Sequence, residues 1–236
     1  MKVSAKRYGK GFTLVELLVV IAIIVALAAI ATPMAFQQLK KAAMTTAINN
    51  GKQIGQALII FDQDYGSFPD QATAQQIPGA GGSASSNDLL RQLVLARTID
   101  TESVFYAKIG GGIQKVDNQI QGNQAIGSRE NAWAYVTNQD GTGLSSASNS
   151  QLPVLMTPLI SGSGSSYRFS ADPFANKAVV VRLNNAAETL NIFDGGEVDG
   201  SGSNNLFPQI FDASGNAISS AQTVTTMMPD GINLQN

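Results

Sequence analysis

A long, almost uninterrupted hydrophobic run lies close to the N-terminus. Residues 12–31 (FTLVELLVVIAIIVALAAIA) contain eighteen apolar residues among twenty, and only Thr13 and Glu16 are polar. Twenty helical residues span about 30 Å, which is the thickness of the hydrocarbon core of a bilayer. The pattern therefore predicts a membrane-spanning helix over residues 12–31.

Beyond Pro33 the pattern becomes one-sided. Apolar residues recur mostly at spacings of three, four and seven, as in an amphipathic helix. This apolar stripe consists of Phe36, Leu39, Ala43, Ala47, Ile54, Leu58 and Phe61. Together the two segments predict one helix over residues 12–61, which Gly66 and Pro69 bring to an end. Its first half is expected to be a protruding stem, and its second half to pack against a globular head over residues 62–236.

Three residues inside this helix are poor helix formers. Pro33 removes a backbone hydrogen bond, so we expect it to kink or loosen the helix. Gly51 and Gly55 each cost about 1 kcal/mol relative to alanine. Either they allow a close approach of the head's sheet, or the helix simply tolerates them.

The first part of the head mixes loops with one short helix. Residues 71–87 are small and polar, which predicts a loop. Residues 88–97 (DLLRQLVLAR) predict a helix with Asn87 or Asp88 as its N-cap and its leucines facing inward.

Strand patterns follow. The alternation of Trp133 and Tyr135 predicts a strand, and residues 152–160 (LPVLMTPLI) predict another. The segments KAVVVRL and ETLNIF flank Asn184-Asn185, which predicts a β-hairpin. We expect residues 204–236 either to lie loosely on the head or to be mobile.

Composition narrows the chemistry. The chain has no cysteine and no histidine, which excludes disulfides, cysteine-ligated zinc and the Ser-His-Asp triad. Its net charge of −2 argues against nucleic-acid binding through phosphate neutralisation.

The charge is unevenly distributed, however. Residues 1–11 carry four cations and no acid, so this flank should stay cytoplasmic. A secretory signal peptide ending near Ala29 and Ala31 is the alternative. Against it, the apolar run exceeds the usual 7–15 residues and contains an acid.

The junction Lys10-Gly11-Phe12-Thr13-Leu14-Val15-Glu16 resembles the processing motif of type IV prepilins and type II secretion pseudopilins. The resemblance implies a pilin-like α+β fold, with a long helix packed on an antiparallel sheet. It also implies that a membrane peptidase removes residues 1–11 by cutting between Gly11 and Phe12, and that Phe12 is then N-methylated. In a filament, the resemblance implies local unwinding of the helix at Pro33.

Glu16 is the one acid in the apolar run. An unpaired carboxylate at bilayer depth costs roughly 2.5–3.5 kcal/mol. The resemblance implies that Glu16 pairs with the N-terminal amine of Phe12 in a neighbouring subunit and so sets register during assembly. Alternatively, Glu16 lies near the headgroups and reaches water.

Three classes of function remain. The first is a structural subunit of a type IV pilus or of a type II secretion pseudopilus. The segment Asp-Tyr-Gly-Ser-Phe-Pro at residues 64–69 resembles major pseudopilins, and the missing cysteine pair departs from many type IV pilins. The second is a minor or tip subunit that acts as an adhesin or substrate-binding module. The third is a tethered enzyme that uses carboxylates, but no carboxylate pair stands out by spacing.

The resemblance also implies partners and a location. The partners would be other copies of the chain, the prepilin peptidase, an inner-membrane assembly platform and an ATPase. The protein would cross the inner membrane once, with its head in the periplasm before assembly. No nucleic acid is expected as a partner.

The C-terminal region concentrates acids and glycines. Calcium prefers clustered oxygen ligands on flexible loops. We therefore consider a calcium site formed by Asp194, Glu197, Asp199 and Asp212, as in the C-terminal loop that major pseudopilins use. A solvated turn is the alternative, because the spacing does not match an EF-hand.

Overall fold

The computed structural model describes residues 12–82, 84–163, 166–193, 195–198, 206–207, 209–211, 217–219 and 224–234. Contacts divide the chain into two compact units, Met1–Leu39 and Lys40–Asn236. Helix α1, Leu14–Tyr65, begins in the first unit and ends in the second. The single long helix predicted from the sequence is thus confirmed, although it begins two residues later and ends four residues later than expected.

The first unit contains the apolar part of α1. Every described residue from 12 to 39 is exposed, including Phe36 and Leu39, which are 61% and 60% exposed. These two members of the apolar stripe are therefore not buried in the single chain. The helix also continues through Pro33, so the expected unwinding is not seen in the single chain.

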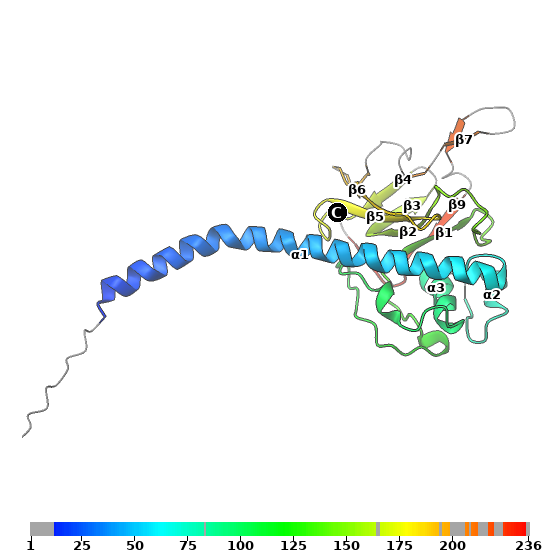
Figure 1. Ribbon diagram of the computed structural model, residues 1–236, viewed down its shortest axis with the longest axis horizontal. Coiled ribbons are helices and arrows are strands. Elements are labelled where there is room, and N and C mark those ends of the chain that lie inside the picture. The colour runs from blue at the N-terminus through cyan, green and yellow to red at the C-terminus, as the bar shows by residue number, and fades with distance from the viewer. Residues whose placement is uncertain are drawn as a thin grey trace, which may run out of the picture. The chain divides into compact units, whose positions relative to one another are not determined.

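The second unit is built on a five-stranded antiparallel sheet in the order β6-β5-β2-β1-β9 (Figure 1). Its strands are β1 Ala134–Asn138, β2 Pro153–Thr157, β5 Lys177–Arg182, β6 Ala187–Asn191 and β9 Val224–Met227. The hairpin of β5 and β6 is the one that the sequence predicted. With α1, this sheet confirms the α+β, pilin-like fold class.

Two small antiparallel sheets complete the strands. They are formed by β3 Leu159–Ser163 with β4 Ser166–Phe169, and by β7 Gln209–Phe211 with β8 Ala217–Ser219. Two predictions need correction. The run 152–160 is divided between β2 and β3 rather than being one strand. In addition, residues 224–227 do not lie loosely on the head, because they form the edge strand β9 and pair with β1.

Short helices precede β1. They are α2 Gln71–Ala74, α3 Ser86–Leu95, η1 Glu102–Phe105 and η2 Gly122–Gln124. Residues 71–74 were expected to be loop, but the Asp70 side chain accepts a hydrogen bond from the Thr73 amide and caps α2. The N-cap of α3 is Ser85, not Asn87 or Asp88, and both of those lie inside the helix.

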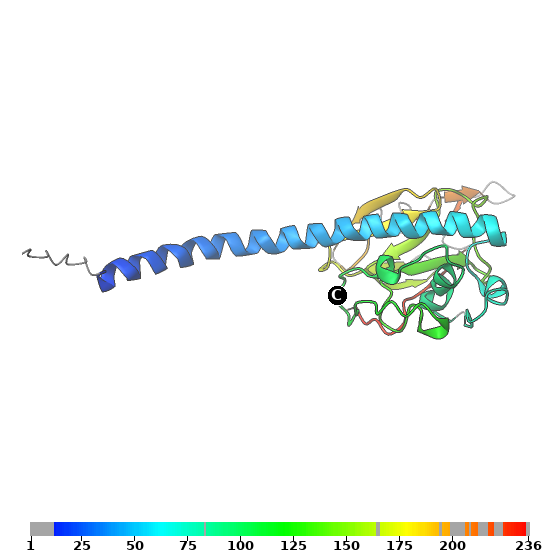
Figure 2. The same cartoon turned by 60° about the horizontal axis from the view of Figure 1, so that its bottom comes forward.

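The second half of α1 packs against the sheet (Figure 2). A Cβ atom on Gly51 would lie 2.7 Å from the side chains of both Trp133 and Val181, and one on Gly55 would lie 2.4 Å from Asn185 Oδ1. The two glycines therefore allow close approach of the sheet rather than being merely tolerated. The buried α1 residues are Ala47, Gly51, Ile54, Gly55, Ala57, Leu58 and Phe61.

Candidate functional site

The first turn of α1 is closed by two side chains. The backbone N–H and the hydroxyl of Thr13 donate to Glu16 Oε2 at 2.9 and 2.8 Å. In return, the Glu16 N–H donates to Thr13 Oγ1 at 3.2 Å. This is a capping box, in which two otherwise unpaired backbone donors are satisfied reciprocally. The Glu16 carboxylate therefore has a partner within its own chain.

The sequence interpretation gave Glu16 an assembly role but missed its partner Thr13. The signal was present, because a threonine three residues before a glutamate, at the start of an apolar run, is the signature of a capping box. Phe12, one residue earlier, is 74% exposed. Gly11 lies outside the described residues, so the pairing of Phe12 with Glu16 and the cleavage between Gly11 and Phe12 stay predictions.

The stem behind this cap is apolar on all sides. α1 is long and apolar enough to cross a membrane, with a mean hydropathy of 3.1 in its most apolar window, and none of that window is buried. Exposed apolar side chains on this scale mark a surface that lipid or another protein covers. The most exposed of them include Phe12, Leu14, Val15, Val25, Leu27 and Ile30.

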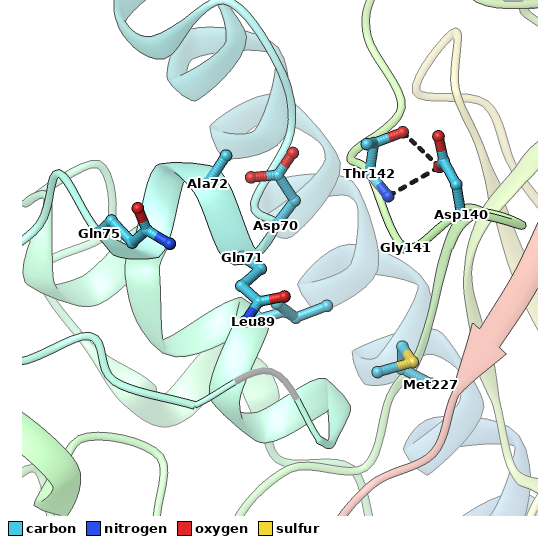
Figure 3. A pocket seen from close by; sticks show the side chains of 9 residues that line it. All are labelled: Asp70, Gln71, Ala72, Gln75, Leu89, Asp140, Gly141, Thr142 and Met227. Carbon is cyan, nitrogen blue, oxygen red and sulfur yellow. Dashed lines mark hydrogen bonds between the residues drawn. The ribbon is translucent and has the colours of Figure 1, made fainter.

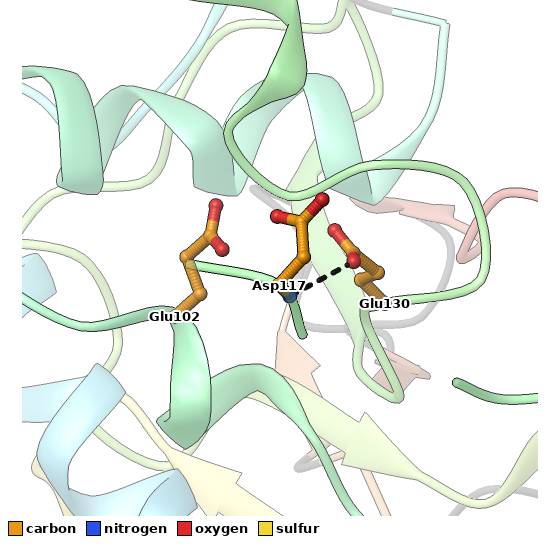
Figure 4. A group of neighbouring side chains, drawn as sticks. All are labelled: Glu102, Asp117 and Glu130. Carbon is orange, nitrogen blue, oxygen red and sulfur yellow. Dashed lines mark hydrogen bonds between the residues drawn. The ribbon is translucent and has the colours of Figure 1, made fainter. Parts of the chain in front are cut away.

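A second group of polar side chains lies in the head. Glu102 in η1, Asp117 in the following loop and Glu130 shortly before β1 each place a carboxylate oxygen within 4.8 Å of the others (Figure 4). Glu102 is 0% exposed and Glu130 is 8% exposed, whereas Asp117 is open to solvent. The sequence interpretation missed this group because its members are far apart in the chain and follow no short motif.

Backbone amides hold two of these carboxylates. The Ile126 N–H donates to Glu102 Oε1 at 2.7 Å. The N–H groups of Asp117 and Gly127 donate to Oε1 and Oε2 of Glu130 at 3.2 and 2.7 Å. Burial raises the pKa of Glu102, and the charges of Glu130 and Asp117 add to this, although hydrogen bonds from the backbone of Ile126 and Asn118 oppose it.

Of the four residues predicted to form a calcium site near the C-terminus, only Glu197 lies among the described residues. Asp194, Asp199 and Asp212 lie outside the described residues. Glu197 is exposed, and its backbone carbonyl accepts a hydrogen bond from the Phe193 N–H at 2.8 Å. This calcium site therefore stays a prediction.

A pocket of about 410 Å³ opens beside α2 (Figure 3). Its carboxylates are engaged by neighbouring loop groups. Asp140 Oδ1 accepts hydrogen bonds from the N–H and hydroxyl of Thr142, and Asp70 Oδ2 accepts one from the Gly143 N–H. The pocket residues are Asp70, Gln71, Ala72, Gln75, Leu89, Asp140, Gly141, Thr142 and Met227.

Comparisons with known proteins agree with the N-terminal architecture. Residues 6–32 match the prokaryotic N-terminal methylation motif. The fimbrial protein EcpC of Eikenella corrodens is 29% identical over 154 residues, which cover 65% of this chain and 99% of that protein. No solved structure matches the chain. These similarities point to a structural protein rather than an enzyme.

Proposed function

We propose, starting from the finding that the chain is type IV pilin-like, that it is a structural subunit of a helical pilus. The observation that carries this proposal is the stem. Residues 12–39 are exposed throughout, the run 12–31 is apolar on all sides, and the match to the methylation motif at residues 6–32 covers this run. In the membrane, lipid would cover this surface, and in a filament the stems of neighbouring subunits would replace the lipid.

Processing is the first proposed step. The prepilin peptidase would remove residues 1–11 by cutting between Gly11 and Phe12, and Phe12 would be N-methylated. Because the cut precedes the apolar run, the mature chain keeps its anchor. Before assembly the protein would lie in the inner membrane as a single-pass protein, with residues 62–236 in the periplasm.

Assembly would then exchange one partner of Glu16 for another. In the single chain, Glu16 Oε2 accepts two hydrogen bonds from Thr13. The amine of Phe12, freed by cleavage, would approach the same carboxylate from a neighbouring subunit and form an ion pair. A buried polar pair of this kind is best suited to fixing register. The capping box keeps the carboxylate oriented until that partner arrives.

The similarity to a fimbrial protein favours a pilus over a type II secretion pseudopilus. An inner-membrane platform and a cytoplasmic ATPase would extract the subunits one at a time. Recovery of the protein in filaments sheared from the cell surface supports the pilus. Its retention in the periplasm would support the pseudopilus instead.

The test of the proposal compares Glu16→Ala with Thr13→Val. Both substitutions break the capping box, but only the first removes the carboxylate. We expect both variants to be processed and inserted, as judged by intact mass: loss of residues 1–11 and a gain of about 14 Da for the methyl group. Filament yield should fall at least tenfold for Glu16→Ala and remain within about twofold of wild type for Thr13→Val.

Two results would contradict this account. Equal loss of filaments in both variants would mean that the helix cap, rather than the pair between subunits, is what assembly needs. Normal filament yield from Glu16→Ala would remove the proposed role of the carboxylate altogether.

A further inference from the structure

Hydrogen bonds hold the acidic cluster of Glu102, Asp117 and Glu130, since backbone amides donate to both glutamates and Gln119 donates to both oxygens of Asp117, but no cation among the described residues forms an ion pair with it. The ion pairs among the described residues involve other carboxylates, namely Asp172, Asp88 and Glu188. Two of the three cluster members are almost fully buried. Burying carboxylates close together is costly unless a proton or a cation neutralises them, and one bound cation would neutralise the cluster as a whole.

Glu102 supplies an independent sign of a missing partner. Its Oε1 accepts the Ile126 N–H, but its Oε2 is buried and accepts no hydrogen bond of good geometry, although the Asn118 amide also acts on this carboxylate. Figure 4 shows the Glu102 carboxylate on the side facing Asp117, which lies between Glu102 and Glu130. Buried polar atoms are nearly always satisfied in folded proteins, and an exception needs an explanation. A bound cation would satisfy this oxygen.

We propose that Glu102, Asp117 and Glu130 bind one calcium ion. All three side chains offer oxygen, which favours a hard cation over zinc or copper. Two oxygens bound to one Ca²⁺ at 2.3–2.6 Å are at most about 5 Å apart. The cluster oxygens, within 4.8 Å of one another, already meet this limit. Mg²⁺ demands near-ideal octahedral geometry and gives up its water reluctantly, so a set of protein carboxylates carried by loops favours calcium.

The ion would tie three segments of the head together. Glu102 belongs to η1, Asp117 to the irregular loop that follows, and Glu130 to the residues leading into β1. Solvent reaches the cluster through the exposed Asp117, which gives the ion a way in. Water or backbone carbonyls would complete the six to eight ligands of calcium. The site would form within one chain and depends neither on filament assembly nor on the predicted C-terminal calcium site.

The experiment uses the full mature chain in detergent, stripped with EGTA and then titrated with CaCl₂ or MgCl₂. Calorimetry gives stoichiometry and affinity, and Trp133, the only tryptophan, reports thermal unfolding. We expect one site, with Ca²⁺ bound at least tenfold more tightly than Mg²⁺. At 100 times its Kd, Ca²⁺ should raise Tm by about 5–10 °C.

The decisive variant is Glu102→Gln with Asp117→Asn. Glutamine keeps the oxygen that accepts the Ile126 N–H, so this variant should fold. We expect calcium binding at this site to fall at least 100-fold. In EGTA the variant should be as stable as the wild type or more stable, because buried charge has been removed. Asp100→Asn, which removes an exposed carboxylate from a nearby loop, should bind calcium normally.

A second comparison separates this site from the C-terminal one. Asp194→Asn with Asp199→Asn should leave binding at the cluster unchanged. The proposal is overturned if Glu102→Gln with Asp117→Asn binds calcium as tightly as the wild type. It is equally overturned if the wild-type protein binds no calcium at millimolar concentration, or if only the C-terminal variant loses binding.

Discussion

Gly51 fixes how closely α1 can approach the sheet. The position lies in mid-helix, where glycine is unfavourable by about 1 kcal/mol, so its presence has to be offset by packing. That packing is visible, because the rings and methyl groups of Trp133 and Val181 occupy the space that a Cβ atom would need. The sequence shows that glycine is a poor helix former but not which side chains pack against it. For this reason the sequence left open whether Gly51 allows close approach of the sheet or is simply tolerated.

Gly51→Ala should destabilise the head by up to about 2 kcal/mol. Overpacking costs about 1–3 kcal/mol, and the better helix propensity of alanine recovers about 1 kcal/mol of this. Denaturant unfolding followed by Trp133 fluorescence measures the change. Gly81→Ala is the matched control, since a Cβ atom there meets nothing within 4 Å, and it should be neutral. A stabilised Gly51→Ala variant would contradict the close approach.

At the scale of elements, Asn131 fastens α3 to β1. Its Nδ2 donates to Ser86 Oγ at 2.9 Å and to the Trp133 carbonyl at 3.0 Å, and its Oδ1 accepts the Trp133 N–H at 3.0 Å. Asn131 is fully buried. The side-chain amide of Asn131 thus forms hydrogen bonds with the backbone N–H and carbonyl of Trp133, just before β1, and with the hydroxyl of Ser86, at the start of α3.

Asn131→Ala should cost about 2–4 kcal/mol, because it leaves the buried N–H and carbonyl of Trp133 with fewer partners and opens a small cavity. Urea unfolding by circular dichroism measures the loss, and near-ultraviolet signals of Trp133 report whether its surroundings change. Asn149→Ala, at an exposed position, is the control. A loss below about 0.5 kcal/mol would mean that α3 is held by its apolar face alone.

Elements that the sequence predicted well have strong local periodicity. The long helix and the hairpin of β5 and β6 follow from spacing and turn residues within a few positions. β9 was missed because the polar residues around VTTM show no apolar alternation, and its partner β1 lies about ninety residues earlier. The acidic cluster was missed because its three residues are far apart in the sequence. Loops bring them together, and no local sequence pattern indicates that they are close in space.

At the scale of the whole molecule, the two units differ in what they bury. Every described hydrophobic residue of the core lies at or beyond Ala47. The described residues 12–39 bury none of their side chains. The free energy that folds the head therefore comes from the second unit, while the apolar surface of the first unit drives insertion into lipid or association with other stems.

A chain restricted to residues 40–236 should consequently fold without its stem. We expect the same Trp133 emission maximum as in the full mature chain and a Tm within about 3 °C, because residues 12–39 bury none of their side chains. The fragment should remain in the supernatant after ultracentrifugation without detergent, whereas the full chain should sediment with membranes. Unfolding of the fragment would show that the stem contributes to the head's core. Conversely, a full chain that stays in the supernatant would mean that the stem does not anchor the protein in the membrane. Filament subunits could then not be extracted from the bilayer.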